Sequence, residues 1–220
     1  MVSGSSPVVV RPLGERFVER LARCVTGLAF FGIGIAFFIV SDIGVPPWDV
    51  FHQGVSARSD LAVGTVIVIA GFAVLLLWIP LRLRPGIGTV LNAVQIGLVE
   101  NLAEPLIPDA SSIVVRVVYV ALGMLAIALG SGLYIGAELG PGPRDGLMMG
   151  LNARFGISVR LARTVVEIAV LAVGIALGGT VGFGTVVFAL GIGPLVQVTL
   201  RLFRMSPSLV AAAESEAMEQ

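Results

Sequence analysis

Long apolar runs separated by short polar connections dominate the hydrophobic pattern of this chain. Each run is about 20 residues long, the length of a helix that crosses the hydrocarbon core of a bilayer. The third run is the most polar, because it contains Asn92, Gln95, Glu100 and Asn101. The pattern predicts an all-α membrane protein with six transmembrane helices, which are Leu21–Val40, Leu61–Leu81, Gly86–Leu106, Ile113–Ile135, Val159–Gly178 and Gly182–Phe203.

The arginines fall almost entirely on one side of this arrangement. Twelve of the fourteen lie before the first span, after the last span, or around the connections that follow the second and fourth spans. Only Arg58 and Arg116 lie in the other connections. Short Arg-rich loops stay in the cytoplasm, so both termini are predicted to be cytoplasmic.

The second half of the sequence repeats the first with a shift of 96 residues. Residues 86–90 (GIGTV) align with residues 182–186 (GFGTV), and residues 44–49 align with residues 140–145. Seven of the ten glycines in residues 27–97 face a glycine, whereas 16 glycines among the 71 facing residues give about two matches by chance. Because each copy contains three spans, the second copy must enter the membrane from the opposite side. The sequence therefore predicts a 3+3 inverted-topology repeat.

The two three-helix copies are predicted to cover residues 20–106 and residues 107–205. Residues 1–19 are expected to form a cytoplasmic N-terminal tail. Residues 206–220 are polar and acidic, which is typical of a disordered tail.

The composition agrees with a chain that is surrounded by a lipid bilayer. Hydrophobic residues make up 56% of the chain and charged residues 13%, whereas soluble domains contain about 25% charged residues. The formal net charge is zero, so no nucleic-acid partner is predicted. One cysteine and one histidine cannot build an intrachain disulfide or a structural zinc site, and neither a metal nor a cofactor is predicted.

Two short segments, residues 47–57 and residues 143–155, follow the first and fourth spans and are too short to cross a bilayer. Each begins with a proline, which suits the first position of a helix, and each carries an aspartate two residues later. They are predicted to be interfacial helices or half-helices that enter the membrane from opposite faces. Asp49 and Asp145 are then either charges that stabilise the positive helix ends or polar groups that line a central cavity beside amides able to bind an anion.

The G-x-x-P-x-D elements of residues 44–49 and 140–145, with the paired G-x-G-T turns, resemble the YczE/YitT-like bacterial integral membrane proteins. The resemblance covers residues 20–205. It implies a multi-pass protein of the bacterial cytoplasmic (inner) membrane with about six spans and implies no particular substrate. The G-x-G-T turns serve either close helix packing or contact with a passing solute. The predicted structural turns are Gly44, Pro47, Gly86, Gly88, Thr89, Gly140, Pro143, Gly182, Gly184 and Thr185.

Polar side chains within the predicted spans mark the candidate site. Glu167 lies near the centre of the fifth span, where a carboxylate is costly and must face protein, water or a partner, or stay protonated. It is either a functional group or half of a structural pair with Arg163. The polar groups of the third span are either contacts between helices or cavity-lining groups. The candidate substrate-binding residues are Asp49, Asn92, Gln95, Asp145 and Glu167.

His52 is the single histidine of the chain. It is interpreted as a surface or interfacial residue, with two alternatives. One is a pair with Asp49, three residues earlier on the same helix face. The other is a proton relay, for which His52 and Glu167 are the candidates.

These patterns predict a small secondary transporter or permease, as a monomer or a homodimer, for an unidentified small molecule. The alternative is a non-transporting membrane scaffold or an accessory subunit of another enzyme system that uses the Arg-rich cytoplasmic loops. A passive channel needs a continuous pore, for which six short Gly-rich helices leave little room. No catalytic constellation, phosphate-binding loop or metal-ligand motif is recognised in the sequence, so an enzyme is not predicted.

Overall fold

The computed structural model describes residues 16–203 of the chain. The predicted acidic tail, residues 206–220, and most of the predicted N-terminal tail therefore lie outside the described residues. The regular elements within 16–203 are helical, and in chain order they are α1 (Phe17–Ser41), α2 (Pro47–Ser59), α3 (Val63–Leu76), α4 (Trp78–Leu81), α5 (Ile87–Ala103), the 3-10 turn η1 (Glu104–Leu106), α6 (Ile113–Gly136), α7 (Pro143–Phe155), α8 (Val159–Leu177) and α9 (Phe183–Leu202).

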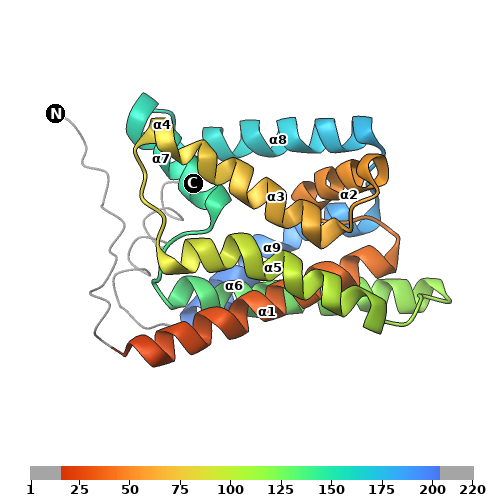
Figure 1. The fold of residues 1–220 in the computed structure, drawn as a ribbon. Helices are drawn as coiled ribbons and strands as arrows, with labels where there is room; N and C mark the ends of the chain where they lie inside the picture. Colours follow the sequence, from red (N-terminus) through yellow and green to blue (C-terminus); the bar gives the residue numbers. More distant parts are fainter. Residues whose placement is uncertain (1–15, 204–220) are drawn as a thin grey trace.

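The helices form two layers (Figure 1). In one layer, α5, α1, α6 and α9 lie in that order, since α1 packs against α5 and α6, and α6 packs against α9. In the other layer, α3 and α8 lie on either side of the short helices α2 and α7. The short helices occupy opposite ends of the molecule in Figure 1.

Glycines bring α1 and α6 into close antiparallel contact at the centre of the first layer. A Cβ added at Gly27 would lie 2.6 Å from the Gly130 carbonyl oxygen, and one added at Gly34 would lie 2.7 Å from the Gly123 carbonyl oxygen. Small residues of this kind let backbones approach in membrane bundles, where packing rather than the hydrophobic effect holds helices together.

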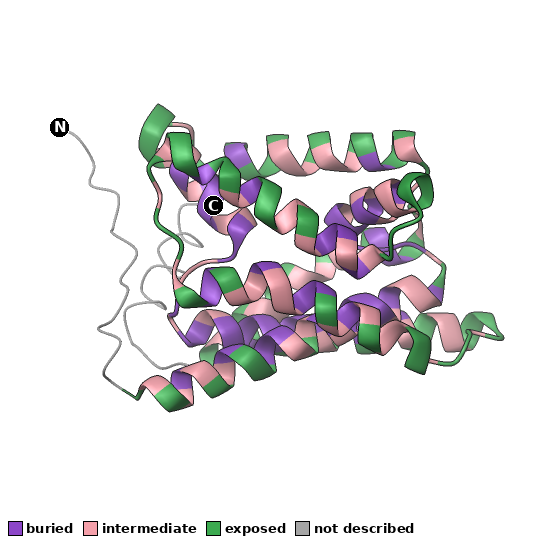
Figure 2. Cartoon of the chain, viewed as in Figure 1, coloured by how far each residue is buried: buried purple, intermediate pink, exposed green. Residues whose placement is uncertain are grey.

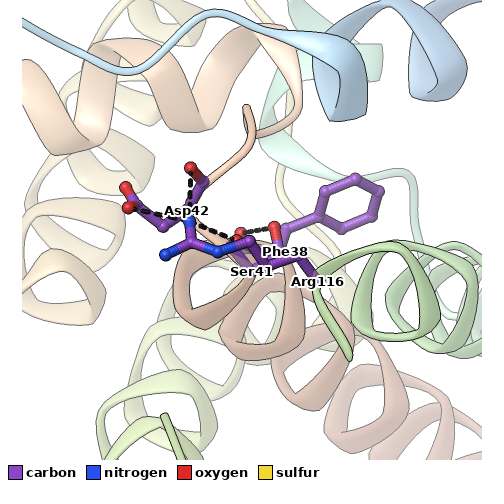
Figure 3. Close-up of polar contacts among 4 residues, drawn as sticks. All are labelled: Phe38, Ser41, Asp42 and Arg116. Atoms are coloured by element: carbon purple, nitrogen blue, oxygen red, sulfur yellow. Dashed lines mark hydrogen bonds and ion pairs between the residues drawn. The ribbon is translucent and has the colours of Figure 1, made fainter. Parts of the chain in front are cut away.

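An arginine from each half binds the C-terminal carbonyls of the central helix of the other half. Arg116 donates to the carbonyls of Ser41 and Asp42 at 3.2 and 3.1 Å and pairs with the Asp42 carboxylate at 3.0 Å (Figure 3). Arg20 donates to the carbonyls of Ala137 and Glu138 at 2.8 and 2.6 Å. Basic side chains suit these positions because the last carbonyls of a helix lack partners within the helix.

The two edges of the layered structure differ. At one edge, α3 packs along α5. A Cβ at Gly71 would lie 3.2 Å from Ala93, and Gly64 directly contacts Gly97. At the other edge, α8 packs against α2 and α7 and makes at most a marginal contact with α9. Only Ala162 and Gly174 of α8 are buried, and most of this helix is coloured as exposed or intermediate in Figure 2.

Four helices within residues 16–203 are long and apolar enough to cross a membrane: α1, the rod of α3 and α4, α6 and α9. These correspond to the first, second, fourth and sixth predicted spans. The third and fifth predicted spans are present as the helices α5 and α8. However, α5 has only 17 residues, and α8 carries Arg160, Arg163 and Glu167. The six-span arrangement therefore stays a prediction.

Candidate functional site

A cavity of about 620 Å³ lies between the two layers and is lined by residues from both halves of the chain. Its wall extends along one face of α9, where Phe188, Ile192 and Val196 contribute apolar surface. Small-molecule sites in proteins usually have volumes of about 300–1,000 Å³ with a few polar groups in an apolar wall. The charged and polar side chains of this wall are Asp49, Asn92, Ser131, Tyr134, Arg144, Asp145, Arg163, Glu167 and Gln197.

The first turns of α2 and α7 both line this cavity, through residues 46–49 and residues 142–145. Both helices begin with a proline, as predicted, because proline has no N–H to satisfy and its φ angle already suits a helix. The loops before them pass through Gly44 and Gly140, whose φ angles are +108° and +121°. These angles favour glycine over residues that carry a Cβ.

The two G-x-G-T turns hold these loops in place. The Gly88 N–H donates to the Leu139 carbonyl at 2.9 Å, and the Gly184 N–H donates to the Ile43 carbonyl at 2.8 Å. The buried Thr89 hydroxyl donates to the Pro141 carbonyl at 2.7 Å. The turns therefore pack against the starts of α7 and α2, and these contacts agree with the packing interpretation of their glycines.

Asp49 and His52 form a buried pair at the start of α2. The Nδ1 atom of His52 lies 2.8 Å from Asp49 Oδ1, and both side chains are almost completely buried. Burial lowers the pKa of the His52 imidazole more than the hydrogen bond to Asp49 raises it. A neutral imidazole that donates from Nδ1 to the carboxylate fits this geometry. The interpretation of His52 as a surface residue is therefore wrong, and its alternative pairing with Asp49 is confirmed.

Arg144 lies over the ring of Trp48, with its guanidinium carbon 4.3 Å from the ring centroid. One of its terminal nitrogens is 3.5 Å from His52 Nε2, which can only accept because a guanidinium has no acceptor. No ion pair joins Arg144 to a carboxylate within residues 16–203. Its N–H groups are thus oriented by an aromatic face without being used up by a bidentate carboxylate contact.

Asp145 and Glu167 add acceptors to the same cavity. The Tyr134 hydroxyl donates to Asp145 Oδ2 at 3.2 Å, which leaves the carboxylate with further acceptor capacity. Glu167 pairs with Arg163 at 3.2 Å, and their side chains are 40% and 61% exposed. Glu167 therefore fits both interpretations, since it forms the helical pair and also lines the cavity.

Four of the predicted substrate-binding residues, Asp49, Asn92, Asp145 and Glu167, line one cavity. The fifth, Gln95, is not among the lining residues, and its amide donates to the Val25 carbonyl of α1 at 2.7 Å. This contact is a polar link between helices, the alternative interpretation of that residue.

The sequence interpretation did not include Arg144, Trp48 or Tyr134 in the site. A signal was available for two of them, because Trp48 and Arg144 occupy matching positions of the predicted repeat, directly before Asp49 and Asp145. Among residues 16–203, no cluster of three or more His, Cys, Asp or Glu residues could hold a metal ion.

Comparison with known proteins places residues 18–201 in a family described as "Family of unknown function (DUF6198)". The chain is 37% identical over 182 residues to an uncharacterized protein of Haemophilus influenzae, covering 83% of this chain and 84% of that protein. It is 33% identical over 189 residues to the uncharacterized membrane protein YczE of Bacillus subtilis, covering 84% and 87% of the two chains. The match to YczE confirms the resemblance seen in the sequence. No solved structure matches this chain.

Proposed function

This chain belongs to the family of unknown function DUF6198, and from that premise we propose that it is a small secondary transporter with one central binding site. It is an integral, multi-pass membrane protein with bacterial relatives. One observation carries the proposal: a cavity of about 620 Å³ collects charged groups from α2, α7 and α8. Charged groups at membrane depth are expensive and usually mark a substrate or ion pathway.

We also infer that the two halves form the predicted 3+3 inverted repeat. Three pairs of features support this inference, each separated by 96 residues. The first pair is Arg20 and Arg116, whose acceptor carbonyls are themselves 96 residues apart. The second pair is the hydrogen bonds donated by Gly88 and Gly184. The third is the left-handed backbone of Gly44 and Gly140.

A six-span topology with both termini in the bacterial cytoplasm follows from this repeat. In that topology α5 and α8 are the third and fifth spans, and α2 and α7 are half-helices that enter from opposite sides. Their first turns then meet near the middle of the membrane, where transporters with inverted repeats place their binding sites. A central pair of half-helix starts explains why the cavity is lined by both copies of the P-x-D element.

The charges of the cavity indicate a small polar substrate that carries both an anionic and a cationic group. Arg144 offers oriented N–H donors to an anion. Asp145 offers carboxylate oxygens to a cation or a hydrogen-bond donor. The apolar face of α9 lines the rest of the cavity, so the part of the substrate that lies there should be uncharged.

A thermal-shift screen of the purified protein with amino acids and related zwitterions tests the proposal. A ligand at about 100 times its Kd should stabilise the protein by about 2.7 kcal/mol. Arg144→Gln and Asp145→Asn should abolish the shift because each removes a charged contact. Gln95→Ala is the matched control, since Gln95 is not part of the cavity wall, and it should keep the shift.

Solvent access to the cavity provides a second test that needs no ligand. Asn92 lines the cavity and is partly exposed, so Asn92→Cys in a Cys24→Ser background should react with a small water-soluble thiol reagent. The native Cys24 is fully buried. An unreactive Asn92→Cys protein that remains folded would contradict a water-filled binding site and with it the transporter.

The second candidate function is a membrane scaffold or accessory subunit of another enzyme system. The observation that favours it is the exposure of basic residues in or beside two connections. They are Arg82 and Arg84 between α4 and α5, and Arg154 and Arg160 at the facing ends of α7 and α8. A scaffold binds its partner through these connections and needs no occupied cavity. In that case, neutralising the four arginines abolishes binding of the partner, whereas Arg144→Gln leaves that binding intact.

A further inference from the structure

Glu100 is a completely buried carboxylic acid between α5 and α3. Neither of its carboxyl oxygens makes a hydrogen bond of good geometry, although Glu104 and the Gly64 backbone lie close to it. Glu100 is not among the residues that line the cavity. The Gly64 N–H donates to Asn101 Oδ1 at 2.9 Å, and the Asn101 amide donates to Thr65 Oγ1 at 3.1 Å.

A carboxylate in such a position is unstable. Burying an ionised carboxylate without a donor costs far more than burying the neutral acid. Two other acidic groups, Glu104 and more weakly Asp49, also act electrostatically on Glu100 and oppose a further negative charge. With α3 packed against α5, Glu100 must therefore hold a proton.

The matching residues in the second half of the chain indicate how the surroundings of Glu100 would change if α3 did not cover α5. Helix α9 makes at most a marginal contact with α8, and four residues in the second half of α9 line the cavity. These residues are Gly193, Val196, Gln197 and Leu200. Their counterparts, 96 residues earlier, are Gly97, Glu100, Asn101 and Glu104. None of these four lines the cavity, and α3 packs along this part of α5.

We propose that Glu100 is the proton-binding site of the transport cycle and that its protonation state decides whether α3 closes on α5. The proposal rests on the transporter function and the inverted repeat, and it names the proton as the coupling ion. In the alternate state, α3 leaves α5 while α8 closes on α9. Glu100 then borders water, as Val196 borders the cavity now, and releases its proton. Glu104, partly exposed one helical turn later, passes protons between Glu100 and the solvent.

Few other charges can produce this effect, given the elements packed around α5, which are α1, α3, α7 and η1. Helix α3 has no titratable side chain. Gly32 of α1 contacts Ile96 and Val99, more than two turns after the charged first turns of α1. At the other end of α1, the cap residue Asp42 is paired with Arg116. The charged side chains of these first turns are Glu19, Arg20 and Arg23. The charged side chains of α7 are Arg144 and Asp145, which line the cavity, and Arg154, which is exposed.

Electron spin resonance distances between α3 and α5 test the proposal without any substrate. Spin labels on Ile69→Cys and Leu98→Cys, both exposed positions, report the separation of the two helices in a Cys24→Ser background in lipid vesicles. The wild-type background should show one short distance near pH 5 and a growing long-distance population toward pH 9, a range above the ordinary carboxyl pKa. Glu100→Gln should lose this change and keep the short distance throughout. Glu19→Gln, a surface acid paired with Arg16 and Arg23, should behave like the wild type.

A pH-independent distance in the wild-type background, or an unchanged pH response in Glu100→Gln, overturns the proposal. Thermal unfolding provides an independent measurement, because the neutral glutamine needs no proton. The Tm of Glu100→Gln should match that of the wild type at acid pH and exceed it increasingly as the pH rises. An equal loss of Tm at every pH contradicts the proposal. A pH-dependent distance with no detectable ligand binding would instead reject the transporter and leave the proton site standing.

Discussion

Arg20 and Arg116 lie 96 residues apart and both bind carbonyls at the end of a neighbouring helix, one in a buried and one in a partly exposed position. Each donates to two successive carbonyls where the other half's central helix ends. These are Ala137 and Glu138 after α6 for Arg20, and Ser41 and Asp42 at the end of α1 for Arg116. Arg20 is 3% exposed, whereas the Arg116 side chain is 31% exposed. Water can replace the contacts of Arg116 far more easily than those of Arg20.

Replacing each arginine by lysine should therefore have unequal effects on stability. Lysine keeps the charge but cannot donate from two rigidly spaced nitrogens, as Arg20 does from Nε and Nη2. The contacts of Arg116 all come from a single nitrogen, Nη1. Arg20→Lys should destabilise the protein by about 1.5–3 kcal/mol, the range for hydrogen bonds that involve a charged group. Arg116→Lys should cost less than about 1 kcal/mol, as is usual for exposed ion pairs. Thermal unfolding in one detergent would measure both, and equal losses would contradict the assignment of burial as the cause.

At the level of elements, α3 and α8 occupy matching positions of the predicted repeat but have different neighbours. Helix α3 packs along α5, whereas α8 stays away from α9 and packs on α2. If the two halves are the inverted repeat proposed above, we infer that this difference represents one end of an exchange in which the halves swap their conformations. The proposed cycle consists of that exchange.

Gly97 and Gly193 provide a matched pair of positions that tests this difference. A Cβ at Gly97 would clash with Gly64 and lie 2.8 Å from Val68, whereas a Cβ at Gly193 would meet nothing within 4 Å. Gly97→Ala should force α3 from α5 and destabilise the protein by about 1–3 kcal/mol. Gly193→Ala should be neutral or gain up to about 1 kcal/mol from the higher helix propensity of alanine. Similar Tm changes in the two variants would show that both edges are packed alike.

At the scale of the whole molecule, the exposed apolar faces require lipid. Large apolar side chains are exposed on nearly every long helix, for example Leu76, Leu102 and Leu190 at 65%, 70% and 77%. A soluble protein rarely exposes so much continuous apolar surface. The exposure of these side chains thus agrees with a bundle whose outer face meets hydrocarbon.

The six-span topology predicts the side of the membrane on which each connection lies. Asp60→Cys and Asp109→Cys, both at exposed positions, should react with a membrane-impermeant thiol reagent added outside intact cells. Arg84→Cys and Arg154→Cys should react only after the membrane is opened. All four variants carry Cys24→Ser. Labelling of residues 84 or 154 from outside would contradict the inverted repeat, and so would protection of residues 60 and 109.

Several helices could be located from the sequence because their limits depend on local chemistry. The segment predicted at residues 143–155 is the helix α7, and the segment predicted from residue 47 is α2, which continues to Ser59. The third predicted span was too long. Helix α5 ends at Ala103, and the predicted range continues through the 3-10 turn η1, where Pro105 lacks the N–H that an α-helix needs.

The sequence by itself determined the class of this protein and the positions of its helices, because apolar run length, proline and glycine act over a few residues. It also placed Asp49 and Asp145 in the first turns that border the cavity. Only the tertiary structure decided that Arg144 stacks on Trp48, that Gln95 binds α1, and that Glu100 is buried beneath α3. Those outcomes depend on which helix packs against which. Two segments with matching local patterns can choose different neighbours because packing energies come from contacts between distant parts of the chain.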